Sequence, residues 1–233
     1  RRVLFRSNNA NELGKKNDKK GISNMKIYRA TLRDSLWTDI EDLSINNKEY
    51  STQHPALSPD NTKLYFTSDM PGGYGGSDIY VADIHPDGTL GSPKNLGPVV
   101  NTKNTEGTPF INNEATLFFA SDGHLGLGML DIFGTIADED GVITAVLNLG
   151  TPVNSNRDDF SFNMNADGLT GYFSSNRQGG RGDDDIYSYY RVPLLHVKGT
   201  VTDAINSKPI PNALITLLDD KGNKIADMVT DEN

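Results

Sequence analysis

The sequence predicts an all-β fold, a partial β-propeller followed by a truncated β-sandwich. The first observation is an internal repeat of 53 or 54 residues, with copies LYFTSDMPGGYGGSDIY at 64–80, LFFASDGHLGLGMLDIF at 117–133 and GYFSSNRQGGRGDDDIY at 171–187. Strand-rich repeats of about 40–50 residues or slightly more are typical of propeller blades. The second observation is that short apolar runs in each copy are bounded by Gly, Asn and Asp, as strands and turns are. About three blades and part of a fourth are expected.

Each full repeat has the pattern of a four-stranded antiparallel blade. The strands expected in the middle copy are Gly107–Ile111, Thr116–Ala120, Asp131–Ile136 and Ile143–Leu149. The second of them is apolar without strict alternation, which suits a strand buried on both faces. A blade that lies between two other blades puts its central strands in that position, whereas a two-layer sandwich favours alternation on its outer strands.

The N-terminal elements follow from the same repeat. Residues 1–7, RRVLFRS, resemble the in-frame translation of a sequencing adapter, so they are excluded from the fold prediction. Residues 26–43 align with the second half of the later repeats, which places the propeller segment at 8–190. Trp37 falls in an apolar column of the repeat. We therefore expect Trp37 to pack in the core, in preference to stacking on a ligand.

The repeat ends after Tyr190, and a different pattern follows. Residues 191–195 are expected to be a linker, and 196–233 the first strands of a small β-sandwich. The sandwich prediction rests on two runs that alternate, Val197, Gly199 and Val201, then Ala213, Ile215 and Leu217. Since the last residues stop inside this pattern, we expect the chain to be a fragment of a longer protein.

Composition excludes several classes of function. The 233 residues carry a formal net charge of −9 and no extended basic cluster, which argues against nucleic acid as a partner. There is no cysteine, so disulfides and thiolate metal sites are excluded, and both periplasm and cytoplasm stay possible. No apolar run approaches the roughly 18 residues that a membrane helix needs.

The strongest motif is the loop of the repeat, Ser-(Asp/Asn)-x3-Gly-x-Gly-x2-Asp. An Asp or Asn after a strand forms Asx-turns, paired glycines permit a positive φ, and the second Asp can accept bonds from backbone N–H groups. Calcium binding and ligand contact are the alternatives, because loop carboxylates are calcium ligands. The structural interpretation is preferred. Its columns are Asp69, Gly73, Gly75 and Asp78; Asp122, Gly126, Gly128 and Asp131; and Asn176, Gly180, Gly182 and Asp185.

Other chemistry has little support in the sequence. The acidic runs 158–159 and 183–185 are interpreted as solvated loops, with a cation site as the alternative. The four histidines, at positions 54, 85, 124 and 196, lack metal-ligand spacing and are interpreted as turn or surface residues. Neither a nucleophile elbow nor a phosphate-binding loop is present. We therefore predict no catalytic residue, no metal ligand and no cofactor.

Several phrases resemble one protein family. HPALSPD at 54–60, LYFTSD at 64–69, NLGPVVN at 95–101 and FSSNR at 173–177 resemble the WD-like propeller repeats of OmpA-family envelope proteins of Gram-negative bacteria. GTVTD and PIPNA, near 199 and 209, resemble the carboxypeptidase-regulatory-like domain. This order is similar to PorE-type proteins of the type IX secretion system. Such proteins bind peptidoglycan through an OmpA-like domain, which these 233 residues do not include.

The sequence therefore predicts a noncatalytic protein-interaction scaffold, periplasmic and associated with the outer membrane. Other envelope proteins are the expected partners, and peptidoglycan would be reached only through the OmpA-like domain. Two alternatives stay open. One is a propeller hydrolase, either a glycosidase or the propeller of a peptidase, which requires carboxylates that converge on a central channel. The other is a sensor or carbohydrate-binding module.

Overall fold

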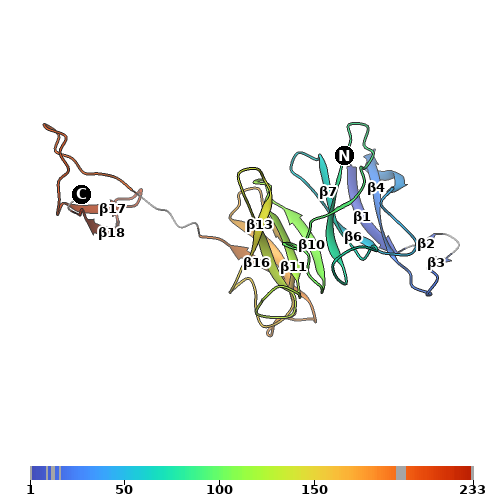
Figure 1. Ribbon diagram of the computed structural model, residues 1–233. Helices are drawn as coiled ribbons and strands as arrows, with labels where there is room; N and C mark the ends of the chain where they lie inside the picture. Colours follow the sequence, from blue (N-terminus) through green and yellow to red (C-terminus); the bar gives the residue numbers. More distant parts are fainter. Residues whose placement is uncertain (1, 9, 12–13, 16, 193–197, 232–233) are drawn as a thin grey trace. The chain divides into compact units, whose positions relative to one another are not determined.

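The computed structural model describes residues 2–8, 10–11, 14–15, 17–192 and 198–231. The chain divides into two compact units, 1–191 and 192–233. Every regular element of the described part is a strand (Figure 1). No helix in the described part is long and apolar enough to cross a membrane.

The first unit contains four antiparallel sheets of three or four strands, here called blades 1 to 4. Blade 1 comprises β1 (Arg2–Asn8), β4 (Met25–Arg33) and β5 (Leu36–Asp42). Blade 2 comprises β6 (Thr52–Leu57), β7 (Lys63–Ser68), β8 (Asp78–Asp83) and β9 (Lys94–Asn95). Blade 3 comprises β10 (Glu106–Ile111), β11 (Leu117–Ser121), β12 (Asp131–Ala137) and β13 (Ile143–Asn148). Blade 4 comprises β14 (Asp159–Met164), β15 (Thr170–Ser175) and β16 (Asp185–Tyr190).

The predicted blade architecture is confirmed. In each blade the strands pair with their neighbours in chain order, and the middle copy has its four strands within a residue or two of the expected bounds. A short pair, β2 (Ala10–Asn11) with β3 (Gly14–Lys15), lies apart from the four blades. The blades of the first unit lie side by side, with first strands of successive blades in contact (Figure 1).

The core of the first unit lies between the blades. Each of blades 2 to 4 carries a stacked aromatic pair on its second and third strands, Phe66–Tyr80, Phe119–Phe133 and Phe173–Tyr187. An isoleucine of the preceding blade packs in the same cluster as each pair: Ile27, Ile79 and Ile132, all fully buried. Burying one such side chain contributes about 1.5–3 kcal/mol, so the isoleucine column holds successive blades together.

Residues 2–8 form strand β1, although residues 1–7 were left out of the fold prediction. Its backbone pairs with β4, with Phe5 opposite Tyr28. Phe66 and Tyr80 are opposite one another in the same way in blade 2. A free sheet edge offers unpaired N–H and C=O groups to any extended segment. An extended segment that is apolar can form these backbone hydrogen bonds and also add apolar side chains to the core.

The first strand of each of blades 2 to 4 contains a bulge that the repeat pattern did not predict. His54, Thr108 and Ser161 have positive φ angles of 51°, 47° and 52°, and the register shifts at each of them. The Thr108 N–H donates to His54 Nδ1 (3.4 Å), and the Ser161 N–H donates to Thr108 Oγ1 (3.2 Å). The bulges therefore link the first strands of blades 2, 3 and 4. His54 is a half-buried residue of β6.

Trp37 also departs from its prediction. It lies on β5, the outer strand of blade 1, and 47% of it is exposed. An outer strand has one free edge and less cover than a central one, so an apolar column in the repeat does not guarantee burial there. The prediction that Trp37 packs in the core was wrong.

The second unit contains one hairpin, β17 (Leu214–Leu218) with β18 (Lys224–Val229). Thr202 and Pro209 form an isolated bridge, while 198–201 form no strand, contrary to the expected alternation there. Val197 and His196 lie outside the described residues. None of the buried apolar core residues of the described chain comes from this unit. The hairpin therefore has little apolar burial to stabilise it.

Candidate functional site

The motif loops all lie at one end of the blades, here called the loop end, between each second and third strand. Asp78 is buried and accepts hydrogen bonds from the Tyr74 N–H (2.6 Å), the Gly75 N–H (3.1 Å) and Asn95 Nδ2 (2.7 Å). In blade 3, Asp131 accepts equivalent bonds from Leu127, Gly128 and Asn148. In blade 4, Asp185 accepts from the Arg181 and Gly182 N–H groups. These carboxylates fold the loop back onto the strand that follows it.

Five of the six motif glycines are required for space, and none of the six for a positive φ. None of the six has a positive φ, whereas the neighbouring Gly72 and Gly179 do, so that part of the prediction was wrong. A Cβ on the first motif glycine would overlap the column carboxylate in all three loops, at Gly73, Gly126 and Gly180. A Cβ on the second, at Gly75 or Gly128, would overlap backbone carbonyls of the connection to the next blade. A side chain is excluded because the loop touches that connection.

The residues of the first motif column, Asp69, Asp122 and Asn176, bind backbone groups more distant in the sequence than the predicted Asx-turn would. Asp69 and Asp122 accept bonds from the N–H groups of Ser51 and Thr105, and Asn176 Oδ1 accepts from the Asp158 N–H. Each partner immediately precedes the first strand of the same blade. The local turn is made by the preceding serine, whose Oγ accepts a bond two residues on, at Ser68, Ser121 and Ser175. The predicted Asx-turn is therefore replaced by a contact over 17 or 18 residues.

A further column, missed in the sequence, closes each blade onto the next connection. Asn101 Oδ1 accepts from the Ile79 N–H (2.8 Å), and its Nδ2 donates to the Ile79 carbonyl (3.0 Å) and Asn95 Oδ1 (2.8 Å). Asn154 makes the same contacts with Ile132 and Asn148. We call this arrangement the asparagine clasp. The repeated phrases NLGPVVN at 95–101 and NLGTPVN at 148–154 were the available signal.

Blade 1 has a variant of this clasp with opposite charges. Asn46 binds the N–H and C=O of Ile27, as its equivalents do. Lys26 occupies the place of the column Asp, and its Nζ pairs with Asp42 at 2.8 Å. In blade 1 a lysine at this column pairs with an aspartate. In blades 2 and 3 an aspartate at this column pairs with an asparagine side chain. The contact is thus preserved although the residues differ.

Two fully buried carboxylates lie beside the clasps. Glu106, on β10, accepts from the Thr102 N–H (2.8 Å), Thr102 Oγ1 (2.7 Å) and Ser121 Oγ (2.7 Å). Asp159, on β14, accepts from the Ser155 N–H and Oγ, and pairs with Arg177 Nη2 at 2.6 Å. A buried carboxylate needs donors on all sides, and the chain supplies them in both cases.

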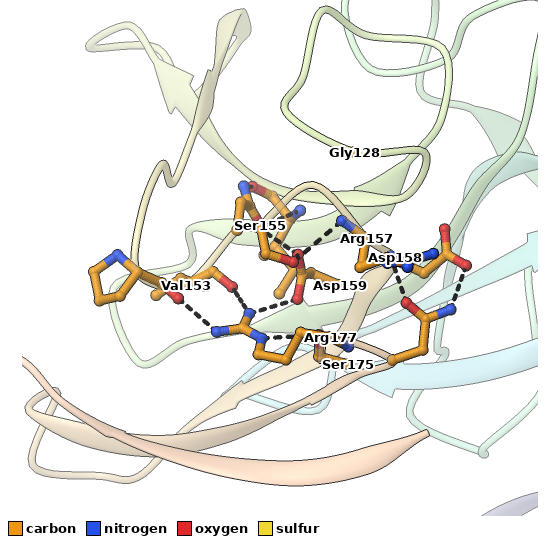
Figure 2. A network of polar contacts seen from close by, with 12 residues as sticks. Gly128, Val153, Ser155, Arg157, Asp158, Asp159, Ser175 and Arg177 are labelled. Carbon is orange, nitrogen blue, oxygen red and sulfur yellow. Dashed lines mark hydrogen bonds and ion pairs between the residues drawn. The ribbon is translucent and has the colours of Figure 1, made fainter. Parts of the chain in front are cut away.

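Arg177 is the centre of the polar network at the loop end of blade 4 (Figure 2). Its guanidinium donates to Asp159, to Ser175 Oγ, and to the carbonyls of Pro152 and Val153. It also lies over the aromatic pair of blade 4, 4.8 and 4.9 Å from the ring centroids. In blade 3, His124 packs on the aromatic pair and contacts the Val100 carbonyl through Nε2 (2.8 Å). His124 is therefore a half-buried residue of the loop that packs on the aromatic pair.

The acidic runs differ from one another. Asp158 accepts bonds from the Leu130 N–H and Asn176 Nδ2, and Asp159 is buried, so the solvated interpretation of 158–159 was wrong. Asp183 and Asp184 are exposed. Across the described ranges, no three His, Cys, Asp or Glu side chains are grouped so as to hold a metal ion. His85 lies exposed in a turn, and His196 is outside the described residues.

The tips of the loops in blades 2 and 3 present large apolar side chains to solvent. Tyr74 and Leu127 share one column and are each 50% exposed. Leu125 and Met129 flank Leu127 and are 96% and 73% exposed. Blade 4 has Arg181 in the column of Tyr74 and Leu127. The loop end thus combines a framework of satisfied carboxylates with exposed apolar tips.

Comparison with known proteins supports the fold. No protein-family model matches the sequence, and no curated protein matches it. Among solved structures, the α-L-arabinofuranosidase of Lactobacillus brevis is 16% identical with a TM-score of 0.53, covering 96% of this chain and 70% of that one. TolB of Acinetobacter baumannii is 14% identical with a TM-score of 0.49, over 89% of this chain and 49% of that one. A putative TolB of Agrobacterium tumefaciens is 16% identical with a TM-score of 0.48, over 97% and 62%.

The chain therefore spans about half the length of the first TolB and under two thirds of the second. At these identities the likeness concerns the fold alone. The likeness to the arabinofuranosidase, at a TM-score of 0.53, supports the all-β blade arrangement that the sequence predicted.

Proposed function

We propose that the first unit is a noncatalytic protein-interaction scaffold, the propeller part of an OmpA-family envelope protein of Gram-negative bacteria. The observation that carries the proposal is the set of exposed apolar tips at the loop end, Tyr74, Leu125, Leu127 and Met129. Exposed apolar side chains gathered on one part of a soluble protein mark sites of protein contact. Tyr and Met are also enriched in the centres of protein interfaces.

The framework beneath the tips suits recognition. Each loop is fixed by its column Asp and by contact with the connection to the next blade. A loop that is already ordered loses little conformational entropy when a partner binds. Rigid loops with apolar tips favour a partner that offers a complementary apolar surface, and a protein is the usual source of one.

The envelope assignment rests on the sequence. The WD-like phrases, and the order of propeller and carboxypeptidase-regulatory-like segment, resemble OmpA-family proteins. The proposal therefore places the protein in the periplasm, associated with the outer membrane, with other envelope proteins as partners. Peptidoglycan binding and a link to type IX secretion belong to this proposal through the resemblance only.

The hydrolase alternative has less support from the arrangement of acids. Glycoside hydrolysis uses two carboxyl groups that face the substrate. Glu106 and Asp159 are fully buried and bonded to donors of the chain, and Asp78 and Asp131 fix loops. These four carboxylates act within the framework. A noncatalytic role therefore uses the observed contacts better.

The proposal is tested by site-specific photocrosslinking in the periplasm of a Gram-negative host. A photoreactive residue is placed at Leu125, at the loop end, or at Val142, in the turn at the other end of blade 3 and 59% exposed. Adducts with an envelope protein are expected from position 125 and not from 142. The double change Leu127→Ser with Met129→Ser should abolish them. Equal adducts from both positions would contradict the assignment of the surface.

A parallel assay separates binding from catalysis. The purified chain is incubated with aryl arabinosides, aryl xylosides and peptide amides. We expect no turnover above buffer. Turnover that disappears in Asp159→Asn but persists in Asp184→Asn, an exposed control, would favour the hydrolase.

A further inference from the structure

Blade 4 differs from blades 2 and 3 in one element. In blades 2 and 3 a fourth strand, β9 or β13, pairs with the outer edge of the third strand. In blade 4, no strand of the described chain pairs with the outer edge of β16. That edge offers a row of backbone N–H and C=O groups, which is a template for pairing with another strand.

The fourth strand of a complete blade brings a fixed set of contacts. In blade 3, Asn148 lies opposite Phe133 and donates to Asp131, and Asn154 binds the N–H and C=O of Ile132. Blade 2 repeats these contacts with Asn95 and Asn101. Both strands end at the first residue of the phrase Asn-Leu-Gly-x-x-Val-Asn, which continues into the connection that follows. This phrase is therefore the sequence that completes a blade.

Blade 4 has the receiving groups for this phrase and lacks the phrase itself. Asp185 accepts the two loop amides, as Asp131 does, but no asparagine amide of the described chain donates to it. Ile79 and Ile132 are fully buried, each against the last valine of the phrase (Val100 or Val153) and the aromatic pair of the following blade. Their equivalent in blade 4, Ile186, is 78% exposed. The same sequence column is thus covered in two blades and open in the third.

An apolar groove runs beside the open edge. It has a volume of about 530 Å³, and Phe118, Leu147, Leu149 and Tyr189 are among the residues that line it. Between blades 2 and 3 the corresponding positions, Tyr65 and Leu96, pack in one cluster with Ile143 and Val146 of the fourth strand. The groove is therefore the place that apolar side chains of a fourth strand would fill.

We propose that the outer edge of β16 is a docking site for an extended polypeptide strand that carries apolar residues followed by Asn-Leu-Gly-x-x-Val-Asn. The strand pairs antiparallel to β16, with its first Asn opposite Tyr187 and donating to Asp185. Its apolar residues enter the groove, and its last Asn binds the backbone of Ile186. Strand addition of this kind takes affinity from main-chain bonds and specificity from side-chain pockets. The proposal rests on the fold and is independent of the proposed function.

The test uses a fluorescent peptide of residues 141–156, GVITAVLNLGTPVNSN, which contains the fourth strand of blade 3. Binding to the intact chain is followed by fluorescence anisotropy. Saturable binding is expected. A peptide with both Asn148→Ala and Asn154→Ala should bind at least about tenfold more weakly, because several hydrogen bonds are lost.

Two protein variants locate the site. Ile186→Asp puts a charge at an exposed position where the valine of the phrase would pack, as Val100 and Val153 pack with Ile79 and Ile132. The change should abolish binding without unfolding the chain. Val142→Asp, a change at another exposed position in the turn at the other end of blade 3, should leave binding intact. Binding that survives Ile186→Asp would overturn the proposal, because the peptide would then be exchanging with β13. The peptide could also fail to bind while sedimentation shows that the chain self-associates and that Ile186→Asp prevents this association. That result would overturn the proposal in favour of a second copy of the chain as the occupant.

Discussion

Blades 3 and 4 have the same motif loop, yet its surroundings differ. In blade 3 the second motif glycine, Gly128, touches the connection that leads to blade 4, and Ile132 is fully buried. In blade 4 a Cβ on Gly182 would meet only the Asp184 carbonyl, at 3.7 Å, and Ile186 is exposed. The comparison teaches that a repeat column specifies what a residue can contact. Burial is decided by the next blade.

The two blades also satisfy their buried acids differently. Glu106 of blade 3 is bound by neutral donors, and Asp159 of blade 4 is bound by Arg177. The guanidinium compensates the buried charge and bonds two carbonyls of the connection at the same time. The Arg177 guanidinium therefore binds both the buried acid of blade 4 and the connection from blade 3. In blade 3 the buried acid is bound by hydroxyl and backbone N–H groups.

The largest effect is expected from Arg177→Met. The change leaves the Asp159 carboxylate buried without its cation, and removing one partner of a buried ion pair costs about 3–5 kcal/mol. The free energy of unfolding from urea denaturation measures it. The control is Lys63→Met, since Lys63 and Asp83 are half exposed and exposed pairs contribute little. The Asp83 carboxylate raises the pKa of Lys63, but solvent screens the pair. Equal losses in the two variants would contradict this account of blade 4.

Removing a clasp should cost somewhat less. Asn154→Ala leaves the N–H and C=O of buried Ile132 without partners, at about 1–2 kcal/mol each, the lower part of the range, because neither group is charged. We expect the free energy of unfolding to fall by about 2–4 kcal/mol. Asn113→Ala, at an exposed turn position, serves as the control and should have no effect. If exposed and clasp positions behave alike, the clasp does not hold the blade.

The paired glycines test the difference between the two loops directly. Gly128→Ala forces overlap with the Arg157 carbonyl, and overpacking of this kind costs about 1–3 kcal/mol. Gly182→Ala in blade 4 should change stability by less than about 0.5 kcal/mol. Both are read from thermal unfolding of the whole chain. A Gly182 variant as unstable as the Gly128 variant would show that blade 4 is covered in solution.

The smallest effect concerns the inner face of β16. Burial raises the pKa of Tyr189 to about 12, and its hydroxyl donates to the Asn163 carbonyl at 3.1 Å. Because the folded pKa lies above the unfolded value of about 10, this contribution to stability is complete below pH 10 and is lost as pH rises toward 12. Tyr189→Phe should cost about 1 kcal/mol at pH 7 and should weaken the loss between pH 10 and 12. Urea midpoints at pH 8, 10 and 11 measure it, and identical pH slopes for both proteins would contradict it.

The blade architecture could be predicted because its signals are local. Strand bounds follow from apolar runs between turn residues, and the repeat shows which positions are equivalent. The roles of Asp69 and Asn101 could not be predicted, because each binds backbone far away in the sequence. The bulge at His54 is a similar case, since its partner Thr108 belongs to the next blade.

The burial of residues on outer strands could not be predicted from the sequence either. Trp37 and Ile186 have apolar equivalents in neighbouring repeats, and both are exposed. Periodicity identifies the column, whereas exposure depends on whether another strand or blade covers it. Residues 2–8 show the converse, because a segment left out of the fold pairs with a free edge.

The asparagine clasp has a consequence for the way the protein is made. Ile79 and Ile132 are each bound by a residue synthesised 22 positions later, in the connection to the next blade. Because translation adds about 5–20 residues per second, the clasp asparagine is synthesised roughly 1–4 seconds after the isoleucine that it binds. A blade therefore gains its clasp only after the connection to its successor has been made.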